Sequence, residues 1–241
     1  MIIKIILLTL LTLLASNIGT FAGFGISTIM IPVLLLFFKL PETLLFVGIL
    51  HLFDDIWKIV LFKKGIRWKL ILSFGIPGII ASYIGASLIL NISQIVLSRI
   101  LAAFFLAYVI FIIIKPNWKL IESYPIATIG GTLSGFFAGI FGVGGAIRGI
   151  FLSAFNLPKE AYLFTAGAIS AVIDITRISK YVVDGIRIDN YILIGMILFI
   201  PASFIGAYLG YKIVNRIPQK YFRLVIGIFL LIISLKLLLF P

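Results

Sequence analysis

Residues 136–155, FFAGIFGVGGAIRGIFLSAF, form a long apolar run that a cluster of glycines at 142–145 interrupts. A second apolar run at residues 18–38, IGTFAGFGISTIMIPVLLLFF, carries a similar interruption at 23–25. Glycine weakens a helix by roughly 1 kcal/mol relative to alanine, so clustered glycines mark a place where helix is not favoured. The fold therefore depends on how the chain passes these two breaks.

The sequence around the two breaks corresponds. Each broken run is followed by a proline, Pro41 or Pro158, and further on Gly65-Ile66-Arg67 matches Gly185-Ile186-Arg187. The matching positions keep their order at a separation of about 120 residues, which is typical of an internal repeat. We therefore predict a first membrane repeat over residues 1–114, a linker over 115–123 and a second membrane repeat over 124–241.

Composition excludes a water-soluble domain. Of the 241 residues, 62% are hydrophobic and 12% are charged, and the mean hydropathy is +1.26. A soluble domain is about one quarter charged, whereas apolar runs of about twenty residues cross a bilayer as helices. The sequence predicts an all-α, polytopic helical membrane protein with two tandem repeats of about four helices, each with a glycine-broken first helix.

The formal net charge of +12 does not indicate nucleic-acid binding. Lys and Arg lie mostly in short loops between apolar runs, where they fix the topology and meet anionic lipid headgroups. With a single His and no Cys, the sequence predicts no metal site and no cofactor. The expected partners are the lipid bilayer and a small substrate.

Charges, prolines and turn residues bound the expected spans. Counting each broken block as one span gives eight, at residues 2–38, 42–62, 68–90, 93–114, 124–155, 159–183, 190–211 and 220–240. The excess of basic residues in alternate loops then puts both termini in the cytoplasm of a multi-pass plasma-membrane protein. If each broken block is instead a hairpin, each half crosses three times and the two halves are inverted.

The segments that follow the breaks carry a family resemblance. They read GFGISTIMIP at residues 23–32 and GVGGAIRGIF at residues 142–151. With its duplicated halves, essentially the whole chain resembles the TauE/SafE-type sulfite exporter family, which are small permeases with eight predicted spans. The resemblance implies transport of sulfite, a sulfonate or a related sulfur anion. Ser27 stands where the family often has another glycine and Phe151 where a proline is usual, which leaves the fold expected and the substrate open.

The glycine breaks are the expected substrate site. A helix that restarts after a break presents free N–H groups and the positive end of its dipole, and both attract an anion. The alternative is close helix packing through small residues. The expected binding residues are Gly23, Gly25, Ser27, Thr28, Gly142, Gly144, Gly145 and Arg148.

Arg148 is expected to contribute most to anion binding. Its counterpart in the first repeat is Ile29, so the repeated scaffold does not require a cation there. A guanidinium within the membrane is rare, and its planar fork suits an oxyanion. The alternatives are that Arg148 extends to the membrane interface or neutralises Asp174. Ser27 and Thr28 could donate to the same anion or bond back to a helix carbonyl.

Three acidic residues, Asp54, Asp55 and Asp174, lie well inside the expected spans. A carboxylate within the membrane is costly and is therefore a functional candidate. Lys58 follows Asp55 and Arg177 follows Asp174 at a spacing of three residues, so each pair could be an internal ion pair. Asp54 has no cation at that spacing, and we expect it to carry a coupling proton.

His51 lies one helical turn before the two acids at 54–55. It is either a packed structural residue or part of a proton relay, because imidazole changes its charge in water near neutral pH.

The leading interpretation is a secondary transporter for a small anion that works by alternating access between the two halves. An anion channel on the same fold is the alternative. A membrane-embedded enzyme is not expected, because the sequence has neither a zinc motif nor a Gly-x-Ser-x-Gly elbow.

Overall fold

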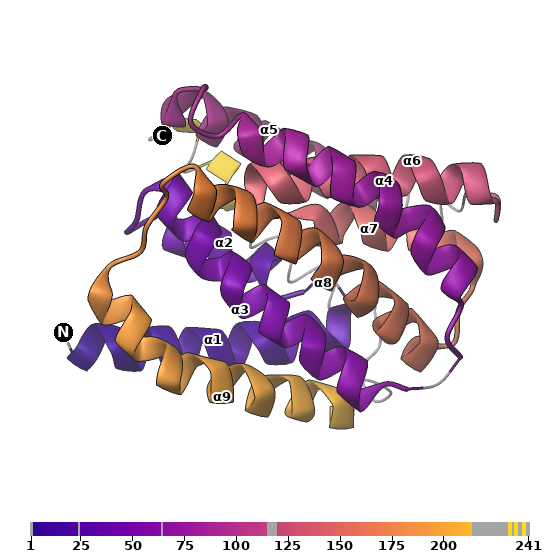
Figure 1. The fold of residues 1–241 in the computed structure, drawn as a ribbon, viewed down its shortest axis with the longest axis horizontal. Helices are drawn as coiled ribbons and strands as arrows, with labels where there is room; N and C mark the ends of the chain where they lie inside the picture. The colour runs from indigo at the N-terminus through magenta and orange to yellow at the C-terminus, as the bar shows by residue number, and fades with distance from the viewer. Residues whose placement is uncertain are drawn as a thin grey trace.

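The structure is a computed structural model that describes residues 2–23, 25–63, 65–114, 120–213, 231–232, 234–235 and 238–239. The regular elements of this part of the chain are all helices (Figure 1). They are α1 (Ile2–Ala22), α2 (Ser27–Leu34), α3 (Leu40–Leu61), α4 (Trp68–Ser87), α5 (Gln94–Ile114), α6 (Tyr124–Phe141), α7 (Gly144–Leu152) with the 3-10 turn η1 (Ser153–Phe155), α8 (Lys159–Val183) and α9 (Asn190–Ile213). The eighth expected span, at residues 220–240, lies largely outside the described residues.

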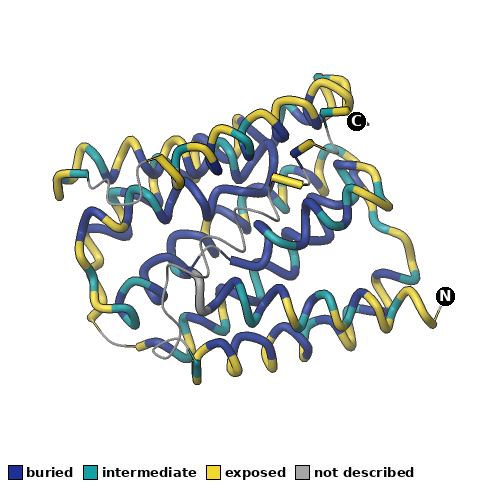
Figure 2. Tube along the Cα trace, turned by 180° about the vertical axis from the view of Figure 1, so that it is seen from behind, coloured by how far each residue is buried: buried dark blue, intermediate teal, exposed yellow. Residues whose placement is uncertain are grey.

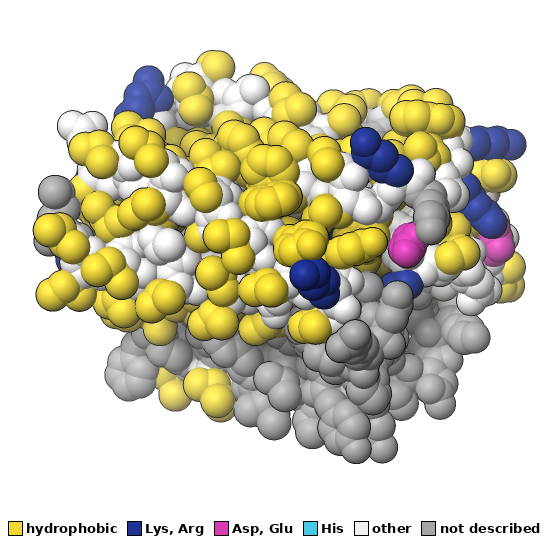
Figure 3. Space-filling view, turned by 90° about the horizontal axis from the view of Figure 1, so that it is seen from below, with side chains coloured by type: hydrophobic (Ala, Val, Ile, Leu, Met, Phe, Trp, Pro, Cys, Tyr) yellow, Lys and Arg dark blue, Asp and Glu magenta, His cyan; other side chains and the backbone are white. Residues whose placement is uncertain are grey.

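Six of the described helices, α1, α4, α5, α6, α8 and α9, are long and apolar enough to cross a membrane. Their outward faces carry exposed apolar side chains such as Leu10, Ile76 and Leu198. Hydrophobic side chains also cover most of the described surface on the face seen in Figure 3. Such a surface is stable against lipid tails rather than water. The chain is therefore a polytopic helical membrane protein, as the sequence predicted.

The second glycine break is the tip of a helical hairpin. Gly142 ends α6 with a left-handed φ of 72°, a conformation that glycine adopts without strain. The chain then folds back, so that Gly144 at the start of α7 lies against Ser134, and Phe151 near its end lies against Gly130. Because positions further along α7 meet positions earlier in α6, the two helices are antiparallel.

The first break turns the chain in a related way. Gly23 and Gly25 both have positive φ values, 79° and 81°, and both donate their N–H groups to the carbonyl of Gly19. A Cβ on Gly19 would lie only 2.7 Å from the carbonyl carbon of Gly25, so the start of α2 packs directly against α1. The hairpin alternative therefore describes both blocks, and the count that treats each block as one continuous span does not.

Two pairs of parallel helices pack backbone to backbone at glycines. In the α1–α9 pair, a Cβ on Gly206 would lie 2.4 Å from the carbonyl oxygen of Leu13. In the α4–α6 pair, a Cβ on Gly135 would lie 2.2 Å from the carbonyl oxygen of Gly78. Small residues permit this close approach, which supplies packing energy where lipid gives no hydrophobic driving force. We call these two contacts the α1–α9 seam and the α4–α6 seam.

Between the seams, α3 and α8 cross at the centre of the molecule, and Figure 2 shows that the middle of the fold is its most buried part. Gly48 of α3 lies near Arg177, whereas Gly167 of α8 lies against the backbone of Asp55, so the two helices run antiparallel. Short loops reverse the chain from α3 to α4 and from α8 to α9. Since α6 is parallel to α4 and α1 is parallel to α9, α1 is antiparallel to α6. The segments that the sequence pairs as repeats thus run in opposite directions, while the repeat itself stays a prediction.

Candidate functional site

Six charged side chains among the described residues are buried, and they balance as three carboxylates and three cations. Every other charged side chain in this part of the chain is at least partly exposed. The buried six, which with His51 we call the central cluster, are Asp54, Asp55, Lys58, Arg148, Asp174 and Arg177. They come from α3, α7 and α8, where the crossing helices exclude both lipid and water. Burial of a charge requires pairing, so these residues depend on one another.

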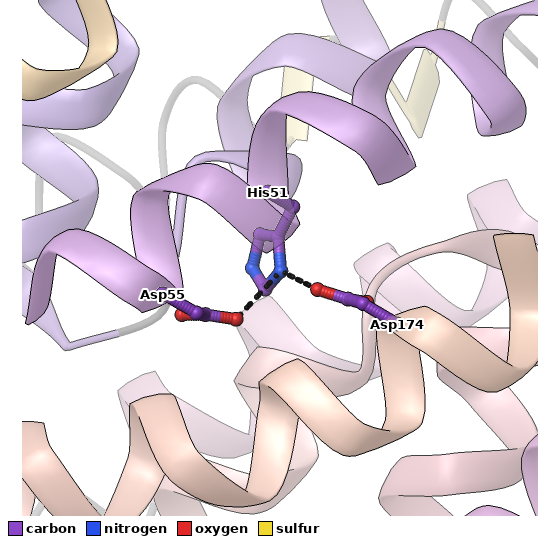
Figure 4. Close-up of side chains that lie close together, drawn as sticks. All are labelled: His51, Asp55 and Asp174. Carbon is purple, nitrogen blue, oxygen red and sulfur yellow. Dashed lines mark hydrogen bonds and ion pairs between the residues drawn. The ribbon is translucent and has the colours of Figure 1, made fainter. Parts of the chain in front are cut away.

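His51 joins the two crossing helices. Its Nδ1 lies 2.6 Å from Asp174 Oδ2 on α8 and 3.0 Å from Asp55 Oδ2 on its own helix (Figure 4). The hydroxyl of Ser170, also on α8, lies 3.4 Å from the same nitrogen. A change in the charge of His51 would therefore alter ionic contacts to both α3 and α8.

His51, Asp55 and Asp174 are close enough together to hold a cation, because one nitrogen or oxygen atom of each lies within 4.8 Å of the others. The sequence predicted no metal here. Positive charge is already supplied by the chain itself, through Arg177 beside Asp174 and Lys58 beside Asp55.

Both ion pairs considered from the sequence are formed. Arg177 Nε donates to Asp174 Oδ1 at 2.6 Å, and Lys58 Nζ donates to Asp55 Oδ1 at 3.0 Å. A spacing of three residues puts each pair on one helix face, as expected.

Asp54 has no cation three residues on, where Trp57 stands, but it is paired at the next spacing. Lys58 Nζ lies 2.7 Å from Asp54 Oδ2, because a spacing of four residues places the two side chains on one face as well as a spacing of three does. Ser16 of α1 donates its hydroxyl to the other carboxylate oxygen at 2.5 Å. Asp54 is thus a paired, hydrogen-bonded carboxylate, and a missing cation does not distinguish it from Asp55 and Asp174 as a proton carrier.

Arg148 is the cation of the central cluster with the fewest partners. It lies on α7, is only 2% exposed, and its Nε has no hydrogen-bond partner among the described residues. Burial shows that it does not extend to the membrane interface. Asp174 is bound by Arg177 and His51 instead, while Arg148 interacts electrostatically with Asp55.

Two of the predicted glycines bring the breaks into contact with the central cluster. A Cβ on Gly25 would lie 2.1 Å from His51 Nε2, and one on Gly142 would lie 3.1 Å from Arg177 Nη1. Both nitrogens are buried and lack a hydrogen-bond partner in the part of the chain that the structure describes, as does the hydroxyl of Ser27 at the start of α2. The two half-helices α2 and α7 also touch. Unpartnered groups able to donate a hydrogen bond therefore gather where both half-helices begin, which suits an anion.

The other predicted residues divide between packing and burial. Gly23 lies against the ring of Tyr162 and Gly144 against the backbone of Ser134, so both serve close packing. Thr28 and Gly145 are buried in the first turns of α2 and α7.

Sequence reasoning missed Ser16 and Ser170, which bond to the central cluster. The repeat offers a signal for Ser170, because it stands at the same distance from His51 as Asp174 does from Asp55. No comparable signal points to Ser16, since only the folded chain brings α1 to α3.

Comparison with known proteins gives two matches. Residues 8–237 match the family described as "Sulfite exporter TauE/SafE". The chain is 25% identical to a probable membrane transporter protein of Methanocaldococcus jannaschii, over 97% of this chain and 95% of that protein. No solved structure matches. The family match covers almost the whole chain, including both glycine breaks and the central cluster, and the helices are those of a multi-pass membrane protein. The chain therefore belongs to the sulfite exporter TauE/SafE family of membrane transport proteins.

Proposed function

We propose that the chain is a secondary transporter that moves a small sulfur-containing anion, such as sulfite or an organosulfonate, across the plasma membrane by alternating access. The family description supports a sulfur oxyanion as the substrate. The sequence has no phosphate-binding loop for a nucleotide, so an ion gradient or the membrane potential drives the transport.

The observation that carries the proposal is the buried guanidinium of Arg148, one turn into α7, whose Nε has no hydrogen-bond partner among the described residues. A buried donor without a partner costs free energy, about 1–3 kcal/mol and more when it is charged, until a ligand satisfies it. The first N–H groups of α2 and α7 also lack partners within their own helices. An oxyanion between the two half-helices would satisfy both, and the guanidinium fork could bind it through two oxygens.

The arrangement of helices supports alternating access. The α1–α9 and α4–α6 seams make two firmly packed pairs on opposite sides of the molecule, whereas the contact of α3 with α8 between them includes an ionic one, from His51 Nδ1 to Asp174 Oδ2. An ionic contact can form again after the helices shift more readily than close backbone packing at glycines can. The seams would therefore move as units about the crossing.

The test is flux in proteoliposomes together with thermal shift, using sulfite, sulfate, thiosulfate, methanesulfonate and acetate. We expect stabilisation and uptake with at least one sulfur oxyanion. Arg148→Lys keeps the charge but loses the fork, and should weaken binding by about 10-fold or more; Arg148→Ala should abolish it. Arg99→Lys, on the exposed face of α5, is the matched control. Wild-type affinity in Arg148→Ala would refute the proposal, and flux far above carrier rates would identify a channel.

A further inference from the structure

The central cluster has an unusual charge balance. Three carboxylates face three cations that are positive at any physiological pH, and the one remaining ionisable group is His51. With a neutral imidazole the buried groups sum to zero. Binding a monovalent anion alone would then leave one uncompensated negative charge in the interior, which is strongly unfavourable. Binding the anion together with a proton restores neutrality.

The geometry of His51 fits this exchange. Its Nδ1 is already engaged with Asp55 on α3 and Asp174 on α8. Its Nε2 is buried, faces Gly25 immediately before α2, and has no hydrogen-bond partner among the residues that the structure describes. When Nδ1 carries the hydrogen of a neutral imidazole, Nε2 can only accept. Protonation turns Nε2 into a donor, directed at the place where the start of α2 would hold an anion.

Among the described residues, charged groups from three helices surround His51 directly or through a carboxylate. On α3 they are Asp55 and, beyond it, Asp54 with Lys58; on α8 they are Asp174 with Arg177; and Arg148 on α7 acts on Asp55. Each carboxylate has a permanent cation or a second partner, whereas the imidazole alone changes its charge in water between about pH 5 and 8.

We propose that His51 takes up the coupling proton, so that one proton travels with each monovalent anion and the transport step is electroneutral. This inference rests on the proposed function and names its coupling ion, the residue that binds it and the stoichiometry. It also replaces Asp54 as the proton carrier.

The experiment uses wild-type proteoliposomes that contain a trapped pH indicator, with the membrane potential clamped by potassium and valinomycin. Methanesulfonate is the probe, because this monovalent anion of a strong acid keeps its charge over the working pH range. We expect inward anion flux to acidify the lumen by one proton per anion, at a rate that does not change when the clamped potential is altered. An imposed inward proton gradient should drive accumulation of the anion.

His51→Asn keeps an amide donor near the Nδ1 position but cannot titrate, and should lower the ratio of proton to anion flux to near zero. Thr176→Ala, on the exposed side of α8, should retain the ratio. If His51→Asn does not fold, the wild-type stoichiometry still decides. Anion flux that follows the potential and leaves the lumen pH unchanged would overturn this inference alone. Absence of flux and of binding with all the anions of the screen would overturn the proposed function itself.

Discussion

Asp174 connects a cation of the central cluster to its imidazole, since Arg177 Nε and His51 Nδ1 both lie 2.6 Å from its oxygens. Asp54 differs, because its cation Lys58 keeps a second carboxylate, Asp55, at 3.0 Å. Asp174→Asn should therefore lower the free energy of unfolding by about 3–5 kcal/mol, since it strands a buried guanidinium. Asp54→Asn should cost clearly less. Thermal unfolding of both variants in detergent, side by side, measures the difference, and equal losses would contradict the assigned pairing.

Some contacts of these residues could be predicted from the sequence and others could not. The Asp55–Lys58 and Asp174–Arg177 pairs follow from helical spacing alone, and both are formed. Helical spacing allows Lys58 to reach Asp54 equally well, but only the side-chain conformation of Lys58 in the folded protein shows that it does so. The contact between His51 and Asp174 joins residues 123 positions apart, so it depends on the crossing of α3 and α8, which no local pattern specifies.

At the scale of elements, the glycine breaks were visible in the sequence because glycine is unfavourable in a helix. The sequence does not show whether each break kinks a helix or reverses the direction of the chain, because glycine is needed for both. The positive φ values at Gly23, Gly25 and Gly142, together with the packing of Gly19 and Gly144, decide for reversal. Outside the breaks, the expected helix boundaries between residues 42 and 211 lie within about three residues of those in the structure.

The α4–α6 seam yields a prediction about helix packing. A Cβ on Gly139 would lie 2.2 Å from the carbonyl oxygen of Ser82, a backbone atom that cannot turn aside. A Cβ on Gly75 of α4 would meet nothing closer than Val172 at 3.7 Å. Gly139→Ala should destabilise the protein by about 1–3 kcal/mol or more, whereas Gly75→Ala should be neutral or stabilising by up to about 1 kcal/mol. Melting temperature and monodispersity in detergent report both, and a neutral Gly139→Ala would show that the seam is looser than described.

At the scale of the whole molecule, alternating access requires the region between α2 and α7 to open to one side at a time. The chain has no cysteine, so Ser27→Cys introduces a single thiol at a position that is only 2% exposed. We expect a membrane-impermeant thiol reagent to label it slowly from either side, and more slowly still when a transported anion is present. Ser93→Cys, in an exposed loop, should react quickly regardless of the anion. Labelling of Ser27→Cys that is fast from both sides at once would point to an open pore.

The α1–α9 seam joins the first helix of the chain to the last one fully described, and this has a consequence for biosynthesis. The hydroxyl oxygen of Ser16 in α1, which donates to Asp54, also lies 2.6 Å from the carbonyl oxygen of Ser203, a residue that the ribosome adds 187 positions later. Asn17 donates its side-chain N–H to the carbonyl of Gly206. A nascent α1 therefore enters the bilayer long before α9 has been made, and its polar side chains Ser16 and Asn17 need another polar partner until then. In a translation product that stops short of α9, these two side chains lack their α9 partners, and membrane quality control could recognise such exposed polar groups.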